Sequence, residues 1–141
     1  MTFPYWKYKP VSLKGLAKRP EVATLHPAHR YLWRVHLQGC MRRGTASTIT
    51  AADFVALISG ACYYCGAPPS NLTKLRSGAN IAYNGIDRVD NAKPYQRANV
   101  VTCCKDCNSM KSDRPAGRFL DQVRKIFHHS ALTLGPTPTA D

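Results

Sequence analysis

The chain has 141 residues, which is the usual size of one domain and enough for a modest core. Its 20 Lys and Arg side chains outnumber its eight Asp and Glu side chains, which gives a net charge of +12. The sequence contains no run of 18 apolar residues, so no membrane span is predicted. The first residues lack the apolar segment of a secretory signal, so we expect an intracellular, reducing compartment rather than secretion. In such a compartment paired cysteines are metal ligands more often than disulfides.

The positive charge is concentrated near the N-terminus. Residues 1–43 carry nine basic residues and one acid, a net +8, whereas residues 44–100 and 101–141 carry +2 each. Three prolines in the first 20 residues exclude a long helix, so residues 1–27 are predicted to form a basic extended arm. A basic arm is typical of proteins that bind a polyanion, and a solubilising surface is the alternative.

Two helices are predicted before the first cysteine pair. Residues 28–43 contain no proline and space their apolar side chains as a helix does, which predicts a basic amphipathic helix ended by Gly44. Thr50 and Asp53 form an N-terminal capping signal for a second, short helix that stops at Gly60. This second helix should bury its apolar side chains, which are Phe54, Leu57 and Ile58.

Strand signals follow in the middle of the chain. Residues 66–80 are predicted to be loop, with short strands at 81–88 and 99–102 joined by the turn-rich residues 90–97. Asn108 is expected to open a brief helix.

The last predicted helix starts after Pro115. Its apolar stripe has the spacing of one helix face and is interpreted as core: Phe119, Leu120, Val123, Ile126 and Phe127. Residues 130–141 are predicted to be a disordered tail, which leaves residues 28–129 as the folded domain.

Two Cys-x-x-Cys pairs bracket the predicted strands, Cys62 with Cys65 and Cys104 with Cys107. Zinc prefers tetrahedral sulfur ligands, and each pair can place two sulfurs on one ion. Two pairs leave no position for water, so we predict a structural zinc whose removal unfolds the domain. Two disulfides or free thiols are the alternative.

Two further cysteines are predicted to be ordinary thiols, Cys40 and Cys103. Cys103 could compete with its neighbour Cys104 for the zinc, but only Cys104 has the required spacing from Cys107.

A second metal is indicated by oxygen ligands between and beside the cysteine pairs. Asp87 is predicted at a strand end and Asn108 at a helix start, from which a carboxylate and an amide oxygen can converge on one hard cation. Mg²⁺ accepts a few protein oxygens and takes its other ligands from water and phosphate. Such a metal can stabilise the charge of a phosphodiester transition state.

With these residues the sequence resembles the HNH endonucleases, whose core is the ββα-metal (His-Me) finger. The matching motifs are Cys-x-Tyr-Cys-Gly, Asn-Gly-Ile-Asp-Arg-x-Asp-Asn and Asn-Val-Val-x-x-Cys-x-x-Cys-Asn-x-x-Lys, at residues 62–66, 84–91 and 99–111. Small phage-type members are most alike, and the likeness spans most of residues 30–128. It implies an α+β fold, in which flanking helices surround a small zinc-stapled, treble-clef-like ββα core.

The resemblance also implies a function, the metal-dependent hydrolysis of DNA phosphodiester bonds. The cofactors would be a structural Zn²⁺ and a catalytic Mg²⁺ or Mn²⁺, and the partner would be duplex DNA. The resemblance to phage-type members is also consistent with a virus-encoded protein. Asp87 and Asn108 match the catalytic metal ligands, Asn99 matches the residue that braces the hairpin loop, and Lys111 would face a phosphate. The basic helix would bind DNA through Arg34, Arg42 and Arg43.

One position departs from the family pattern. The general-base histidine that follows the metal-binding aspartate is Arg88 here, and an arginine cannot accept a proton. Arg88 could clamp the scissile phosphate while Asp90, or a histidine such as His36, activates water. The metal or the substrate phosphate could also suffice, at a rate lower by ~10²–10⁴-fold.

In the third interpretation of Arg88, the protein is a catalytically weak or inactive, zinc-dependent nucleic-acid-binding module. A structural role in a ribonucleoprotein is a weaker alternative, supported by the charge and by aromatic side chains among the first lysines, which could stack on bases.

Overall fold

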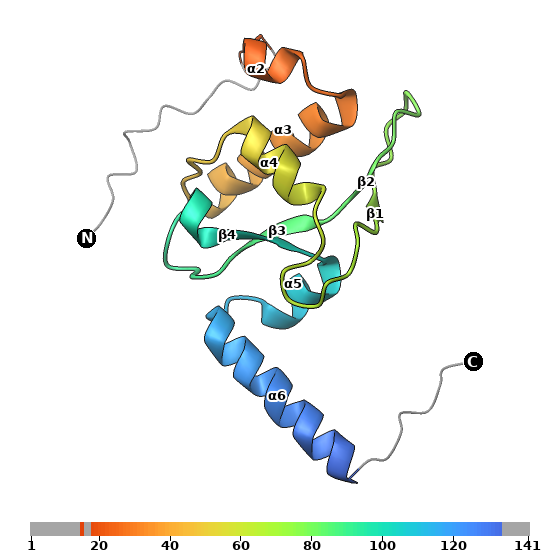
Figure 1. Ribbon diagram of the computed structural model, residues 1–141. Coiled ribbons are helices and arrows are strands. Elements are labelled where there is room, and N and C mark those ends of the chain that lie inside the picture. The colour runs from red at the N-terminus through yellow and green to blue at the C-terminus, as the bar shows by residue number, and fades with distance from the viewer. Residues whose placement is uncertain (1–14, 16–17, 134–141) are drawn as a thin grey trace.

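A computed structural model describes residue 15 and residues 18–133 of the chain (Figure 1). It has an α+β architecture with two small antiparallel sheets, which confirms the predicted class. Most of the arm predicted for residues 1–27 lies outside the described residues, and within the remainder Pro20–Ala23 forms the short helix α2. None of the helices in the described ranges is both long and apolar enough to cross a membrane.

The two helices predicted from capping signals are confirmed. Helix α3 spans Pro27–Arg43 and ends at Gly44, whose φ of 64° is left-handed and favours glycine. Helix α4 spans Ala51–Ile58 and begins with a reciprocal capping box. In this box the Asp53 amide donates to the Thr50 hydroxyl at 3.0 Å and the Thr50 amide donates to the Asp53 carboxylate at 3.2 Å.

The ββα unit lies at the centre of the molecule. Strand β3 (Gly85–Arg88) pairs antiparallel with β4 (Val100–Cys103), and Asp87 stands opposite Val101 in the register. Helix α5 (Lys105–Lys111) follows β4 directly and packs against β3. The three elements therefore bring Asp87 and the second cysteine pair to one place.

A second hairpin precedes this unit. Strand β1 (Asn71–Leu72) pairs with β2 (Ala82–Tyr83), so part of the segment predicted as loop belongs to a hairpin. The single strand predicted for residues 81–88 is divided at Asn84. Figure 1 shows the β1–β2 hairpin projecting away from the helices and from the ββα unit.

Most buried apolar side chains form one group between the N-terminal helices and the ββα unit. We call this group the apolar core, and its members are Val22, Leu32, Trp33, Cys40, Ile49, Ala51, Phe54, Leu57, Ile58, Tyr95 and Val100. A second, smaller group is made of cysteines, with Tyr64 and Ala67 packed against it: Cys62, Cys103, Cys104 and Cys107.

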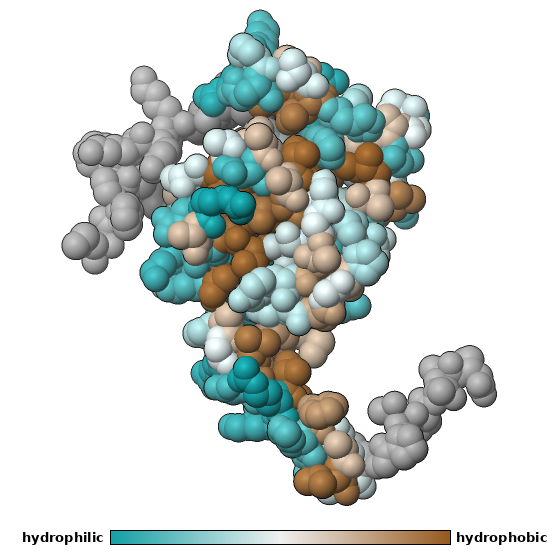
Figure 2. Space-filling view, in the orientation of Figure 1, coloured by the Kyte–Doolittle hydropathy of each residue, from teal (hydrophilic) through white to brown (hydrophobic). Residues whose placement is uncertain are grey.

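Helix α6 (Ala116–Thr133) contradicts the prediction that its apolar stripe is core. Its first turn is buried through Ala116 and Phe119, but Ile126 is 55% exposed and Phe127 66% exposed. The helix projects away from the rest of the molecule, and Figure 2 shows its apolar side chains along an open face. Residues 130–133, predicted to be tail, form its last turn; the rest of that predicted tail lies outside the described residues.

Candidate metal centre and nuclease site

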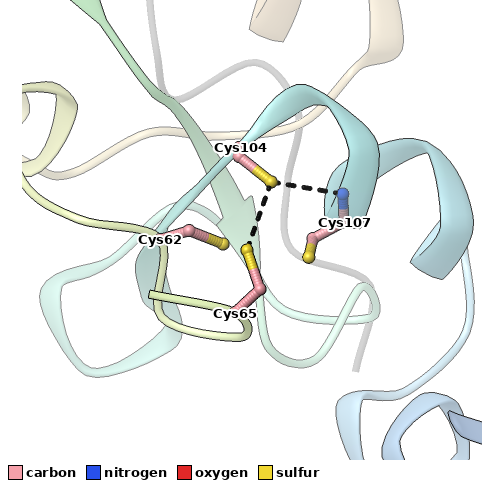
Figure 3. Close-up of side chains that lie close together, drawn as sticks. All are labelled: Cys62, Cys65, Cys104 and Cys107. Atoms are coloured by element: carbon pink, nitrogen blue, oxygen red, sulfur yellow. Dashed lines mark hydrogen bonds between the residues drawn. The ribbon is translucent and has the colours of Figure 1, made fainter. Parts of the chain in front are cut away.

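The two cysteine pairs converge on one point, as Figure 3 shows. The sulfur atoms of Cys62, Cys65, Cys104 and Cys107 all lie within 4.8 Å of one another, and we call this group the four-cysteine site. The sulfurs of Cys65 and Cys104 are 3.7 Å apart. Four sulfurs at zinc–sulfur distances of 2.3 Å in a tetrahedron lie about 3.8 Å apart, so the spacing fits zinc.

The thiols of the four-cysteine site differ in pKa: that of Cys62 is lowered, whereas burial and the neighbouring cysteine side chains raise the pKa of Cys107. The amide of Cys107 donates to the sulfur of Cys104 at 3.4 Å. Burial acts to raise the pKa of Cys62, but donation from three nearby backbone amides outweighs it and lowers that pKa to about 6. The thiolate is the form of cysteine that binds metal.

Cys103 does not belong to the four-cysteine site. Burial, together with neighbouring negative groups, raises the pKa of its thiol, which donates instead to the carbonyl of Cys104 at 3.4 Å. The spacing argument that selected Cys104 as the ligand therefore agrees with the structure.

The carboxylate of Asp87 is held by donors from two other elements. Asp87 is 5% exposed on β3. The ammonium of Lys111 lies 3.2 Å from Oδ1 and 3.1 Å from Oδ2, and the hydroxyl of Tyr64 donates to Oδ2 at 2.8 Å. Tyr64 comes from the first cysteine pair and Lys111 from the last turn of α5. Formation of the four-cysteine site therefore positions both donors.

Lys111 does not face a phosphate, contrary to the expectation from the sequence. Its side chain is fully buried, and its ammonium also donates to the carbonyl of Arg88 at 2.9 Å and to the amide oxygen of Asn91 at 3.3 Å. A buried charge persists when it is paired and hydrogen-bonded, as here. Lys111 is an internal partner of Asp87 and is not accessible at the surface.

Asn108 lies in the middle of α5 rather than at its start, because the helix begins at Lys105 with Cys104 as its N-cap. Its side chain is exposed, and it precedes Lys111 by three residues, so both project from one face of α5. Lys111 contacts Asp87, so Asn108 lies within one helical turn of a residue that holds that carboxylate.

Asp87 and Asn108 supply the ligand types that Mg²⁺ takes, a carboxylate and an amide oxygen. A carboxylate offers about four lone-pair positions, and Lys111 and Tyr64 contact three of them, which leaves room on Oδ1. The ammonium of Lys111 offsets the negative charge of Asp87 and weakens its attraction for a cation. The residues therefore fit a weakly held metal that completes its shell with water and phosphate.

Arg88 points toward the loop after β3. Successive side chains of a strand project to opposite faces, so Arg88 lies across the strand from Asp87. Its Nη1 donates to the carbonyls of Asn91 at 2.8 Å and Lys93 at 2.9 Å, and its guanidinium lies 5.1 Å from the ring centre of Tyr95. These contacts hold the loop and use both hydrogens of Nη1.

Asn99 is buried below the same loop. Its side-chain oxygen accepts from the amide of Asp90 at 2.9 Å, and its nitrogen donates to the carbonyls of Asp90 at 2.9 Å and Pro94 at 3.1 Å. Three hydrogen bonds from one side chain fix the course of the loop, which is the geometry implied for Asn99 by the resemblance.

Neither side chain considered as a substitute base is suited to that task. His36 is stacked between the rings of Trp33 and Phe54, and burial with the charge of Arg43 lowers its pKa to about 4. It belongs to the interior under α3 and α4. The pKa of Asp90 is lowered by the backbone amide of Ala92 and by the ammonium of Lys93, which makes it a weaker base.

The arginines of α3 differ in their freedom. Arg34 and Arg42 are exposed, the former 5.8 Å from the ring centre of Tyr31. Arg43 donates to the hydroxyl of Tyr95 at 3.3 Å, so part of its guanidinium is engaged within the protein.

Two functional contacts were missed from the sequence. Tyr64 lies between the cysteines of the first pair, and burial with its bond to Asp87 raises its pKa, which keeps the phenol protonated as a donor. Asn84, the first residue of the motif at 84–91, is fully buried and donates to the carbonyls of Gly60 and Ala67. An asparagine directly before a strand that carries a candidate ligand was the available signal.

No protein-family model matches the chain. It is 35% identical over 89 residues to an uncharacterized protein of Acanthamoeba polyphaga mimivirus, a match that covers 63% of this chain and 15% of that protein. The chain thus spans a small part of the length of this relative.

Among solved structures the chain is similar to the rare-cutting HNH restriction endonuclease PacI. The TM-score is 0.52 at 24% identity, and the match covers 77% of this chain and 82% of that one. The chain therefore has the fold of an HNH endonuclease, with a four-cysteine site that can hold zinc, and the resemblance found in the sequence is confirmed at the level of fold.

Proposed function

We propose that the protein is a metal-dependent HNH-type endonuclease that hydrolyses phosphodiester bonds in duplex DNA. The observation that carries the proposal is the pair Asp87 and Asn108, presented by β3 and α5 on a scaffold stapled by the four-cysteine site. The similarity to an HNH restriction endonuclease supports it, and the net charge of +12 suits a polyanionic substrate. The likeness to a mimivirus protein supports a viral origin.

Each side chain has a stated task in this proposal. Asp87 and Asn108 would hold Mg²⁺ or Mn²⁺, which when bound supplies charge stabilisation for the scissile phosphate and its leaving oxygen. Tyr64 and Lys111 hold the Asp87 carboxylate in position through a hydrogen bond and an ion pair. The exposed Arg34 and Arg42 would contact backbone phosphates, which supply affinity without sequence information.

The rate should be low for an enzyme of this kind. Arg88 cannot accept a proton and is engaged with the loop, His36 is enclosed, and the pKa of Asp90 is lowered. Without a side chain as general base, the ~10²–10⁴-fold that such a group contributes is missing.

The test is nicking of supercoiled plasmid with Mg²⁺ or Mn²⁺, and the choice of inactive variant matters. Asp87→Ala would leave the ammonium of Lys111 buried without its partner, so lost activity could reflect unfolding. Asn108→Ala removes an exposed ligand instead, and Ser109→Ala, an exposed change on the same helix, is its matched control.

We expect Asn108→Ala to lose at least the roughly 10–100-fold that changes around metal sites cost, with the melting temperature and the activity of Ser109→Ala near those of the wild type. Absence of nicking by the wild type with either metal would contradict the proposal.

A second function, zinc-dependent DNA binding without cleavage, is favoured by one observation. The buried ammonium of Lys111 opposes a cation at Asp87. This alternative predicts that the wild type binds DNA tightly and that its affinity falls with salt. Neither the wild type nor Asn108→Ala should cleave DNA, and the two should bind it with the same affinity.

A further inference from the structure

The β1–β2 hairpin is not used by the site described above. It projects from the molecule as a two-stranded ribbon (Figure 1), and its loop spans residues 73–81. Lys74 and Arg76, both exposed, lie in this loop. The described ion pairs involve Lys93, Arg97, Lys111 and Arg124, so neither of these two cations is neutralised by them.

The sequence around the hairpin has one sign of charge. No Asp or Glu occurs between Asp53 and Asp87, and Lys74 and Arg76 are the charged residues of that interval. The β1–β2 hairpin therefore has a positive potential that no acidic residue nearby in the sequence cancels. Such a potential is typical of an element that faces phosphates.

The loop of the hairpin has a defined shape. The amide of Leu75 donates to the side-chain oxygen of Asn80 at 2.7 Å, and the amide of Ile81 donates to the hydroxyl of Thr73 at 2.9 Å. Gly78 takes a left-handed φ of 73° and its amide donates to the carbonyl of Leu75 at 3.0 Å. The loop is thus preorganised, which lowers the entropy cost of binding a partner through it.

The base of the hairpin is fixed to the candidate nuclease site. Asn84 is fully buried, and its amide donates to the carbonyls of Gly60 at 3.0 Å and Ala67 at 3.2 Å. Three residues further along the chain is Asp87. At about 3.3 Å per residue, the chain from Asn84 to the loop can reach roughly 20 Å, more than half of the 34–36 Å of one DNA turn.

We propose that the β1–β2 hairpin enters the major groove of the DNA beside the scissile phosphate. Arg76 contacts a base edge there, and Lys74 contacts the DNA backbone. A two-stranded ribbon fits the major groove, and arginine is the side chain that most often recognises guanine there, through O6 and N7. This inference rests on the proposed function for its substrate and adds an element that selects sequence.

The test measures DNA binding and sequence preference separately. Binding to a labelled duplex without added divalent metal is compared for the wild type, Arg76→Ala, Arg76→Lys and Lys74→Ala. Arg124→Ala is the matched control, because Arg124 is an exposed arginine of α6 that pairs with Asp121. Sequences selected from a random pool report the preference, and melting temperatures verify the fold.

We expect Arg76→Ala to weaken binding to the preferred sequence by about 5- to 150-fold, the loss of one bidentate base contact. Arg76→Lys should restore the salt dependence of binding but only part of the preference, because an ammonium lacks the planar fork of a guanidinium. Lys74→Ala should weaken binding to all sequences alike and reduce the slope of log K against log salt by about 1. Arg124→Ala should bind and select as the wild type does.

The outcomes separate this inference from the nuclease proposal. If the wild type nicks plasmid while Arg76→Ala binds and selects sequences as the wild type does, the hairpin inference is wrong and the nuclease proposal stands. If Arg76→Ala weakens binding to all sequences alike and keeps the preference, Arg76 contacts the backbone and base reading by Arg76 is wrong. If the wild type never nicks DNA but Arg76→Ala loses affinity and preference, the hairpin inference stands and the nuclease proposal is wrong.

Discussion

The apolar core and the four-cysteine site hold together two parts of one small chain by different means. The apolar core buries large side chains such as Trp33 and Phe54, each of which can contribute a few kcal/mol through apolar burial. The four-cysteine site buries little apolar surface and depends on ligands that a metal can draw together. Asp87 lies beside the four-cysteine site, so the candidate chemistry belongs to the part that apolar burial stabilises least.

The two parts share the β3–β4 sheet, which decides whether they can unfold separately. Val100 at the start of β4 belongs to the apolar core, and Cys103 at its end is packed among the cysteines. Strand β4 has only four residues and one end in each part, so it cannot stay folded in one part while the other part unfolds. We therefore expect the two parts to unfold as one cooperative unit.

Removal of zinc should have the largest effect. Structural zinc sites provide about 10–16 kcal/mol of apparent binding free energy, more than the whole stability of many domains. Chelation should abolish hydrogen-exchange protection in β4 and in α3 together, and added zinc should restore both. Protection of α3 that survives chelation would show that the apolar core folds without the four-cysteine site.

The buried pair Asp87–Lys111 gives the next largest effect. Lys111→Met leaves the carboxylate of Asp87 buried without its cation, which should lower the free energy of unfolding by about 3–5 kcal/mol. Combining it with Asp87→Asn removes the unpaired charge and should recover much of that loss. Chemical denaturation of the zinc-saturated proteins measures both.

Lys105→Met is the control for this pair. Lys105 is exposed on the same helix, so its replacement should change the free energy of unfolding by no more than about 0.5 kcal/mol. A double variant no more stable than Lys111→Met alone would show that the pair is not the source of the loss.

A pH series probes His36, which stacks on two side chains of the apolar core. The pKa of His36 is about 4 in the folded protein, because of burial and then the charge of Arg43, against 6.5 when unfolded. Between these values the unfolded chain binds more protons, so the contribution of neutral His36 is complete above pH 6.5 and is lost as the pH falls toward 4. From pH 7 to 5.5 the loss should be about 1 kcal/mol.

His36→Phe keeps the aromatic stacking with Trp33 and Phe54 and removes the titration. Protonation of the four-cysteine site affects both proteins alike, so the difference between their stabilities isolates His36. Equal pH dependence of the free energy of unfolding in the two proteins would contradict the assignment.

Local signals in the sequence were sufficient for the helices of the apolar core and for the members of the four-cysteine site. Gly44 ends α3, Thr50 with Asp53 begins α4, and the spacing of the cysteine pairs selects Cys104 over Cys103. Each of these features depends on residues a few positions apart, so a sequence pattern contains the whole interaction.

The environment of Asp87 could not be predicted in the same way. Tyr64 and Lys111 reach it from 23 and 24 residues away along the chain, and their contacts exist only once the two cysteine pairs meet. The direction of α6 was missed for a related reason. Periodicity identifies an apolar face, but it does not say whether another part of the protein covers that face.

The smallest expected effect tests that direction of α6 with two phenylalanines of one helix. Phe119 is 5% exposed and lies against the ring of Tyr64, with ring centres 5.5 Å apart, whereas Phe127 is 66% exposed. Phe127→Ala should change the free energy of unfolding by no more than about 0.5 kcal/mol, while Phe119→Ala should cost about 3–5 kcal/mol.

Chemical denaturation at micromolar protein compares the two variants directly. Because Phe119 supports Tyr64, and Tyr64 holds Asp87, Phe119→Ala should also lower nicking activity at temperatures where it remains folded. A loss of several kcal/mol from Phe127→Ala would mean that the open face of α6 is covered in solution. The apolar stripe would then be buried as predicted, but by a surface other than that of the described residues.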